Sequence, residues 1–171
     1  MNMEINPSEY KILIVDDVMS NVLLLKVLLT NEKFAIATAN NGRQALEQVD
    51  KEHPDLVLLD VMMPDLSGFE VAQRLKSNPD TADIPIIFLT ALNSTTDIVK
   101  GFQAGASDFI SKPFNKEELI IRVTHQVSLV AAKRIILNKT EELQRIIAGR
   151  DKLYSVIAHD LRSPMGSIKM V

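Results

Sequence analysis

The chain has 171 residues, no cysteine and a formal net charge of −3 at pH 7. The lack of cysteine excludes disulfide-stabilised folds and thiolate metal sites. The first residues lack the basic start and apolar stretch of a signal peptide, and no uncharged apolar run approaches the roughly 18 residues of a membrane span. These features predict a cytoplasmic protein that makes no contact with a membrane.

Five apolar runs alternate with helical segments from residue 11 to residue 111. The expected strands cover residues 11–15, 34–39, 56–60, 85–90 and 107–111, and the expected helices cover residues 20–29, 43–51, 68–77 and 95–103. Ser20 and Asn21 are expected to cap the first helix, and Ala104-Gly105 is expected to end the fourth. This alternation predicts an α/β fold built on a doubly wound parallel sheet.

A long helix is expected from Lys116 to about Arg162, as one helix or as two in close succession, because the segment has one glycine and no proline. Ile136, Leu143 and Ile157 are separated by multiples of seven residues, with further apolar residues at positions 147, 154 and 161. Beyond residue 133 this spacing favours a parallel two-stranded coiled coil, and hence a homodimer, over a helix that packs back on its own domain.

The charge of the chain is unevenly distributed. Residues 1–115 carry 9 Lys and Arg against 16 Asp and Glu, whereas residues 116–171 carry 10 against 6. We interpret the basic part as a solvated helix surface and do not expect nucleic-acid binding, because aromatic residues are not interleaved with the basic ones.

Polar side chains lie at the carboxyl ends of four of the expected strands and should meet at one edge of the sheet. They are Asp16, Asp17, Asp60, Thr90 and Lys112. Crowded carboxylates repel one another unless a cation is bound, and an incomplete set of oxygen ligands suits Mg²⁺. Asp60 could attack phosphorus to give an acyl phosphate, with Mg²⁺ and Lys112 screening the transferred oxygens. The chain has no Walker sequence, so a nucleotide is not expected as the direct substrate.

In this order along the chain, these residues resemble the receiver domain of response regulators in two-component signalling. The resemblance covers residues 10 to about 125 and includes Asp16-Asp17, Asp60, Met62-Met63-Pro64, Gly68, Thr90-Ala91 and Lys112-Pro113-Phe114. It implies a flavodoxin-like sheet of five strands in the order 2-1-3-4-5, with Asp60 as the phosphoacceptor. It also implies that Asp17, Asp60 and the backbone carbonyl of Met62 bind Mg²⁺ directly, while Asp16 acts through water.

The same resemblance assigns Thr90 and Phe109 to the switch positions of the family. The aromatic ring would move inward when Thr90 turns toward the phosphate. Phe109 stands where a tyrosine is commoner, so a hydroxyl contact with a partner would be lost. The expected phosphodonor is a histidine kinase or a phosphotransfer protein.

A second motif lies at residues 155–164, Ser-Val-Ile-Ala-His-Asp-Leu-Arg-Ser-Pro. His159 is followed by Asp160, whose carboxylate can orient the imidazole and take its proton. The segment resembles the H-box of a histidine kinase dimerisation and phosphotransfer domain, with Pro164 at the usual bend. The two resemblances together imply a receiver domain at residues 8–125, a coiled-coil linker at 126–154 and a truncated first phosphotransfer helix at 155–171.

We therefore expect a fragment of a hybrid histidine kinase, which is a histidine protein kinase whose ATP-binding domain is not in this chain. Its receiver would regulate the attached kinase through the dimeric coiled coil. Two alternatives stay open: a structural dimerisation module that is not phosphorylated, and a phosphorelay from His159 to Asp60 within the protein. An aspartyl phosphatase is disfavoured, because Met62 occupies the position of the second acid.

Overall fold

The computed structural model describes residues 5–91 and 95–160, with side chains described up to residue 149. The chain divides into two compact units, Met1–Val130 and Ala131–Val171. Helix α5 (Lys116–Asp160) belongs to both, so the long helix expected from the sequence is a single helix over the described residues. None of the described helices is both long and apolar enough to span a membrane.

The first unit contains a five-stranded parallel sheet with the order β2-β1-β3-β4-β5, which confirms the predicted fold and strand order. Its strands are β1 (Lys11–Val15), β2 (Ala35–Ala39), β3 (Leu56–Asp60), β4 (Ile86–Thr90) and β5 (Asp108–Ser111). Val15 pairs with Leu59, and Thr90 pairs with Ser111. Because the strands are parallel and nearly equal in length, their carboxyl ends lie along one edge of the sheet.

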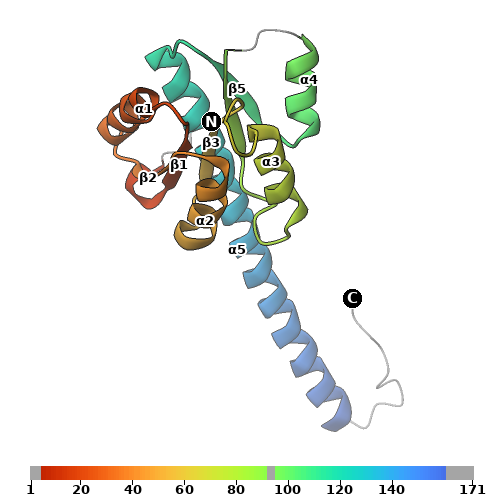
Figure 1. The fold of residues 1–171 in the computed structure, drawn as a ribbon. Helices are drawn as coiled ribbons and strands as arrows, with labels where there is room; N and C mark the ends of the chain where they lie inside the picture. Colours follow the sequence, from red (N-terminus) through yellow and green to blue (C-terminus); the bar gives the residue numbers. More distant parts are fainter. Residues whose placement is uncertain (1–4, 92–94, 161–171) are drawn as a thin grey trace. The chain divides into compact units, whose positions relative to one another are not determined.

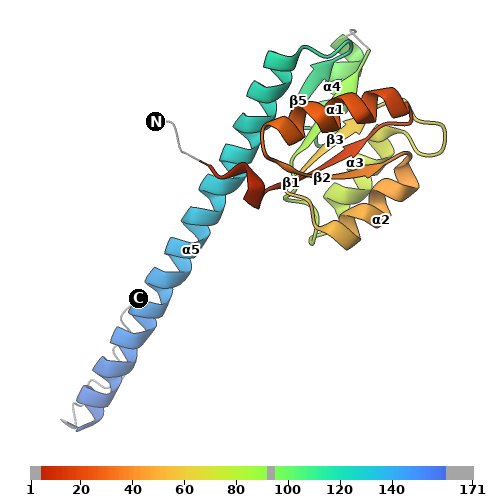
Figure 2. The same cartoon turned by 90° about the vertical axis from the view of Figure 1, so that its left-hand side faces the viewer.

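Helices lie on both faces of the sheet (Figures 1 and 2). They are α1 (Met19–Asn31), α2 (Gly42–Glu52), α3 (Gly68–Ser77), α4 (Thr95–Gln103) and the first turns of α5, and a short 3₁₀ helix η1 (Pro7–Glu9) precedes the sheet. Successive strand residues point to opposite faces. Leu13 and Val57 therefore pack with residues of α2 and α3, whereas Ile12 and Leu58 pack with residues of α1 and α5.

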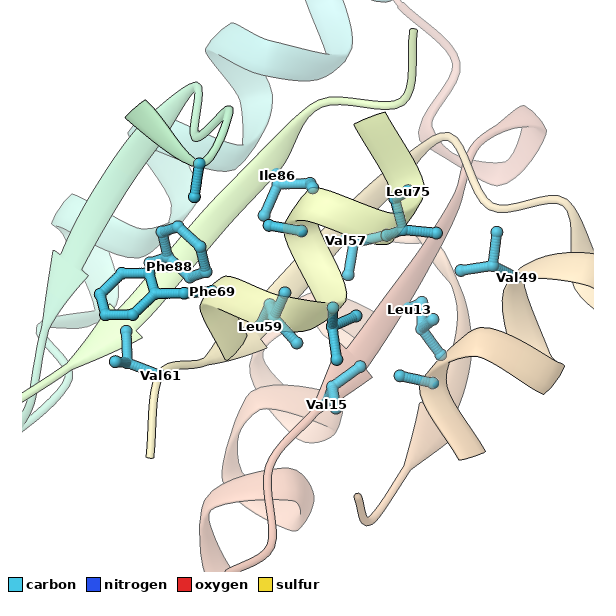
Figure 3. Packing of buried hydrophobic residues seen from close by; sticks show 14 of the residues in the cluster. Leu13, Val15, Val49, Val57, Leu59, Val61, Phe69, Leu75, Ile86 and Phe88 are labelled. Atoms are coloured by element: carbon cyan, nitrogen blue, oxygen red, sulfur yellow. The ribbon is translucent and has the colours of Figure 1, made fainter. Parts of the chain in front are cut away.

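Both core layers are almost entirely apolar. Figure 3 shows the layer under α2 and α3, in which the rings of Phe69 and Phe88 lie together, with their centroids 5.2 Å apart in an edge-to-face arrangement. Every residue of β3 and β4 is buried, as expected for strands covered on both faces. This burial fixes the two strands whose ends carry Asp60 and Thr90.

Helix α1 begins differently from the prediction that Ser20 and Asn21 cap it. It starts at Met19, and its N-cap residue, Val18, makes no side-chain capping bond. The side chain of Asp16 organises this turn instead, because its Oδ1 accepts a hydrogen bond from the backbone N–H of Val18 (2.9 Å). The capping prediction was wrong because the helix begins at Met19, so that Ser20 and Asn21 lie inside its first turn.

Other element ends agree with the sequence to within about one or two residues. Gly105 ends α4 as predicted, with a φ of 105° and a hydrogen bond from its N–H to the carbonyl of Phe102 (3.0 Å). Strand β2 starts one residue later than expected, because the N–H of Phe34 bonds to the carbonyl of Leu29 at the end of α1 (3.2 Å).

Gly68, at the start of α3, has no room for a side chain. A Cβ atom there would lie 2.2 Å from the backbone oxygen of Asp60 and 2.9 Å from the Cα of Val61. Gly68→Ala should therefore lower the free energy of unfolding by about 2–3 kcal/mol, because backbone atoms cannot move aside freely. Urea denaturation followed by circular dichroism measures the loss. In the control, Gly149→Ala, the new Cβ would meet nothing within 4 Å in the described part of the chain apart from its own helix backbone and chain neighbours. Equal midpoints for the two variants would contradict the expectation.

Candidate functional site

Three aspartates form a carboxylate cluster at the carboxyl edge of the sheet. Asp16 and Asp17 follow β1, and Asp60 is the last residue of β3. One carboxylate oxygen from each residue lies within 4.8 Å of those of the other two. Asp16 is fully buried and Asp60 is 3% exposed, whereas Asp17 is exposed. The cluster is thus open to solvent through Asp17, while its other two carboxylates are held in the protein.

Lys112 brings a positive charge to this cluster. Its Nζ lies 3.1 Å from Oδ1 of Asp60 and 3.2 Å from Oδ2 of Asp16. Its backbone N–H donates a hydrogen bond to the carbonyl of Thr90 (2.9 Å), which ties the end of β5 to the end of β4. Burial alone would lower the pKa of Lys112, but Asp60 and Asp16 together raise it, so the amine stays protonated at neutral pH.

The carboxyl group of Asp60 has an unusual proton affinity. The pKa of Asp60 is raised from 3.8 to about 6, because burial and the negative charge of Asp16 together outweigh the opposing effect of Lys112. Oδ1 of Asp60 also accepts a hydrogen bond from the backbone N–H of Met62 (3.4 Å). A cation bound beside Asp60 would favour the ionised form and lower this pKa again.

Two polar side chains make contacts that the sequence did not predict, although Asn21 was expected to cap a helix. Asn21, inside α1, donates a hydrogen bond from its side-chain amide to Oδ2 of Asp16 (3.2 Å). Asp65, in the loop after β3, accepts hydrogen bonds from the backbone N–H groups of Gly42 and Arg43 (3.1 and 3.0 Å). A polar residue in a helix or loop is too common a feature to be singled out before the fold brings it to its partner.

Thr90 and Phe109 lie on the neighbouring strands β4 and β5. Thr90 is 4% exposed, at the end of its strand. The Phe109 ring packs between Phe88 and Phe102, with centroid distances of 5.6 and 5.0 Å. Gly101 makes room for this ring, because a Cβ atom at Gly101 would lie 2.2 Å from Cζ of Phe109. The positions fit the predicted switch pair, whose motion stays a prediction.

Comparison with known proteins identifies this arrangement. The family model of the response regulator receiver domain matches residues 12–124. The chain belongs to the response regulator receiver family. The response regulator PleD of Caulobacter vibrioides (strain NA1000 / CB15N) is 42% identical over 140 residues, which cover 82% of this chain and 30% of PleD. The DNA-binding response regulator MtrA of Mycolicibacterium paratuberculosis (strain ATCC BAA-968 / K-10) is 42% identical over 113 residues, covering 66% of this chain and 49% of MtrA.

A solved receiver structure has the same fold. The receiver domain of the sensor histidine kinase PA1611 from Pseudomonas aeruginosa PAO1 superposes with a TM-score of 0.65 at 26% identity, covering 70% of this chain and 98% of that domain. A magnesium ion is coordinated in the active-site cleft of that structure. By contrast, this chain spans less than half the length of PleD or MtrA, so the matches describe its receiver and not a whole protein.

The prediction that the parent protein is a histidine protein kinase is wrong. PleD and MtrA are response regulators, and the matching family model describes a receiver domain. The prediction rested on a short helical motif, and a histidine beside an aspartate on a helix is compatible with many roles. His159 and Asp160 end α5, but their side chains and residues 161–171 lie outside the described part of the chain. Their roles stay predictions, as do the domain boundaries at residues 125 and 154.

Asp60 should give the receiver a pH-dependent stability that Asp60→Asn lacks. Because the pKa of Asp60 is raised from 3.8 to about 6 in the fold, its contribution to stability is fully present below pH 3.8 and is lost as the pH rises through about 6. Without divalent cations, Asp60→Asn should gain stability relative to the wild type over that range, reaching on the order of 1–2 kcal/mol at neutral pH. Urea denaturation at several pH values measures this, and a difference that does not change with pH would contradict it.

Proposed function

We propose that Asp60 is the phosphoacceptor of this receiver and that a histidine kinase or a phosphotransfer protein supplies its phosphoryl group. The observation that carries the proposal is the approach of Lys112 Nζ to within 3.1 Å of Asp60 Oδ1, inside a cluster that includes Asp16 and Asp17. This arrangement joins a nucleophilic carboxylate to a fixed positive charge. Membership of the receiver family supports the same reading.

The proposed reaction transfers a phosphoryl group without redox chemistry. A carboxylate oxygen of ionised Asp60 attacks the phosphorus of a phosphohistidine, a P–O bond forms and the P–N bond breaks. The electron pair of the broken bond stays on the nitrogen, and the histidine leaves as neutral imidazole when its other nitrogen carries a proton. Lys112 can stabilise the charge on the transferred oxygens, since its ammonium is held 3.1 Å from Asp60.

The residues present fit a magnesium ion. Asp16, Asp17 and Asp60 offer only oxygen atoms, grouped within 4.8 Å, and hard divalent cations prefer such donors. We propose that Asp17, Asp60 and the backbone carbonyl of Met62 hold Mg²⁺ directly and that Asp16 acts through water. When bound, the ion supplies positive charge that offsets the carboxylates and the incoming phosphoryl group. The magnesium ion in the PA1611 receiver supports this assignment.

We further propose that Thr90 and Phe109 report phosphorylation. Thr90 is buried at the end of β4, where its hydroxyl could bond to a phosphoryl group on Asp60. Phe109 is only partly buried and lies on β5, the strand paired with β4. Movement of the Thr90 side chain would change the space available to the ring.

Incubation with acetyl phosphate and Mg²⁺ should add the mass of one phosphoryl group to the wild-type chain, because Asp60 is ionised and paired with Lys112. Intact-mass spectrometry measures the adduct, and hydroxylamine should remove it, since it cleaves acyl phosphates. Asp60→Asn should show no adduct. Lys112→Ala should bind Mg²⁺ yet be phosphorylated about 100-fold more slowly, because the fixed charge is lost.

Two matched control variants test whether the loss of phosphorylation is specific to the site. Asp50→Asn and Lys26→Ala make similar changes at exposed helical positions and should be phosphorylated like the wild type. If the wild type binds Mg²⁺ but gains no phosphoryl group, the proposal is wrong and the alternative of a structural dimerisation module is favoured.

We also propose that the second unit forms a parallel coiled coil with a second copy of the chain. Ile136, Leu143 and Ile147 are 63%, 57% and 45% exposed in the single chain. Leu143 follows Ile136 by seven residues and Ile147 follows Leu143 by four, which is the heptad pattern of a coiled-coil seam. A neighbouring helix would cover these side chains and remove their apolar surface from water. The proposed linker covers residues 126–154.

Changing Leu143 and Ile147 together to Asp should give a folded monomer, because two charges per helix would be buried at the seam. Light scattering coupled to size-exclusion chromatography should show about half the wild-type mass, while circular dichroism should keep the α/β signal. The control pair, Asn138→Asp with Ala148→Asp, places the same charges away from the seam and should leave the dimer intact. An unchanged mass for Leu143→Asp/Ile147→Asp would refute the coiled coil.

The motif at residues 155–171 supports one limited proposal. His159 could exchange a phosphoryl group with Asp60 of the same protein, with Asp160 orienting the imidazole. Only the sequence supports this reading. With acetyl phosphate and Mg²⁺ as the source, exchange should place an acid-labile, base-stable phosphoryl group on the wild type that is absent from both His159→Gln and Asp60→Asn, and its absence from the wild type would contradict the proposal.

A further inference from the structure

The loop that follows Asp60 is fixed at both ends by backbone hydrogen bonds. The N–H of Val61 donates to the carbonyl of Leu89 (3.2 Å), and the N–H of Gly68 donates to the carbonyl of Val61 (2.9 Å). Between these points lie residues 62–67, including Met62, which is 68% exposed. The end contacts alone do not determine where the middle of the loop lies.

Asp65 connects the middle of this loop to helix α2. Its Oδ1 accepts a hydrogen bond from the N–H of Gly42 (3.1 Å), and its Oδ2 accepts one from the N–H of Arg43 (3.0 Å). These N–H groups have no partner within an α-helix, and the positive end of the helix dipole favours a carboxylate. Burial would raise the pKa of Asp65, but bonds from the backbone N–H groups of Leu66, Arg43 and Gly42 outweigh it, so the pKa is lowered and the group is ionised at neutral pH.

A close packing contact supports the same connection. A Cβ atom at Gly42 would lie 2.6 Å from Cβ of Leu66 and 3.2 Å from its backbone oxygen. The missing side chain therefore lets the loop approach the helix. We call Gly42, Arg43, Asp65 and Leu66 the loop clamp.

Helix α2 has its own cap and does not need Asp65 in order to begin. Oδ1 of Asn41 accepts a hydrogen bond from the N–H of Gln44 (2.9 Å), and the carbonyl of Asn41 accepts one from the N–H of Ala45 (2.9 Å). Asp65, which accepts the bonds from Gly42 and Arg43, lies 23 and 22 residues further along the chain than these two residues. Their particular effect is to hold the loop to the helix.

We propose that Asp65 is a positioning residue that holds the loop carrying Met62 against α2 and thereby sets the affinity of the site for Mg²⁺. The inference rests on the proposed function in one respect, the use of the Met62 carbonyl as a ligand. Magnesium demands nearly octahedral geometry, so a small displacement of a ligand weakens binding. Groups that orient metal ligands typically change affinity by about 10- to 100-fold.

Calorimetric titration of the full chain with MgCl₂ tests this directly and does not depend on phosphorylation. Asp65→Ala should raise the dissociation constant for Mg²⁺ about tenfold. Asp65→Asn should lie between Asp65→Ala and the wild type, because one carbonyl oxygen can still accept a hydrogen bond. Asn41→Ala removes the cap of the same helix without touching the loop, so it should lose stability but keep the dissociation constant within about twofold of the wild type.

A second measurement distinguishes a role of Asp65 in positioning the Mg²⁺ ligands from a role in stability alone. With acetyl phosphate as the donor, Asp65→Ala should need about tenfold more Mg²⁺ for half the maximal phosphorylation rate, with little change in the rate at saturation.

Equal Mg²⁺ affinity in the wild type and Asp65→Ala, or equal weakening in Asp65→Ala and Asn41→Ala, would overturn the inference. If the wild type binds Mg²⁺ but gains no phosphoryl group, the phosphoacceptor proposal fails while the calorimetric comparison still decides the role of Asp65. A wild type that binds no Mg²⁺ would overturn both the metal site and the role of Asp65.

Discussion

The pairing of Lys112 with Asp16 and Asp60 is the interaction on which the site depends. Two nearly buried carboxylates at short range would otherwise favour protonation, and the pKa of Asp60 is raised to about 6, chiefly by burial and by the charge of Asp16, even with Lys112 beside it. The ammonium group lies within 3.2 Å of both residues and offsets part of that cost. Removing one partner of such a group would leave the remaining charges without compensation. The same charge arrangement that stabilises the ionised site is what a phosphoryl acceptor requires.

This arrangement is precise because its members extend from buried strands. Asp60 and Thr90 end β3 and β4, whose residues are all buried, and Lys112 directly follows β5. The start of α3 and the loop after β3 are held in place by individual contacts. Gly68 brings α3 against the backbone of Asp60, and the loop clamp ties the loop to α2. The positions of Asp60, Thr90 and Lys112 therefore depend on the core as well as on polar contacts.

The sequence supported the receiver prediction much better than the histidine kinase prediction. Receiver residues are spread over four strand ends, so their combined order is specific, and the family comparison agrees with it. The kinase prediction rested on one helical stretch around His159, and the relatives PleD and MtrA are response regulators. A motif confined to one helix specifies little, because helical spacing and an adjacent carboxylate arise for many reasons. The distributed pattern was the stronger basis for inference.

The sequence by itself determined the parallel α/β fold and the meeting of Asp16, Asp17, Asp60 and Lys112, because apolar periodicity and alternation fix where parallel strands end. The strand order followed from the resemblance to receiver domains. Only the tertiary structure decided what begins α1, which residues orient Asp16, and which helix Asp65 reaches. The turn before α1 is held by a hydrogen bond from the N–H of Val18 to Asp16 and not by the expected caps Ser20 and Asn21, and Asp65 accepts bonds from N–H groups more than 20 residues away. Such contacts depend on the distance and direction between groups remote in the chain, which local residue patterns do not encode.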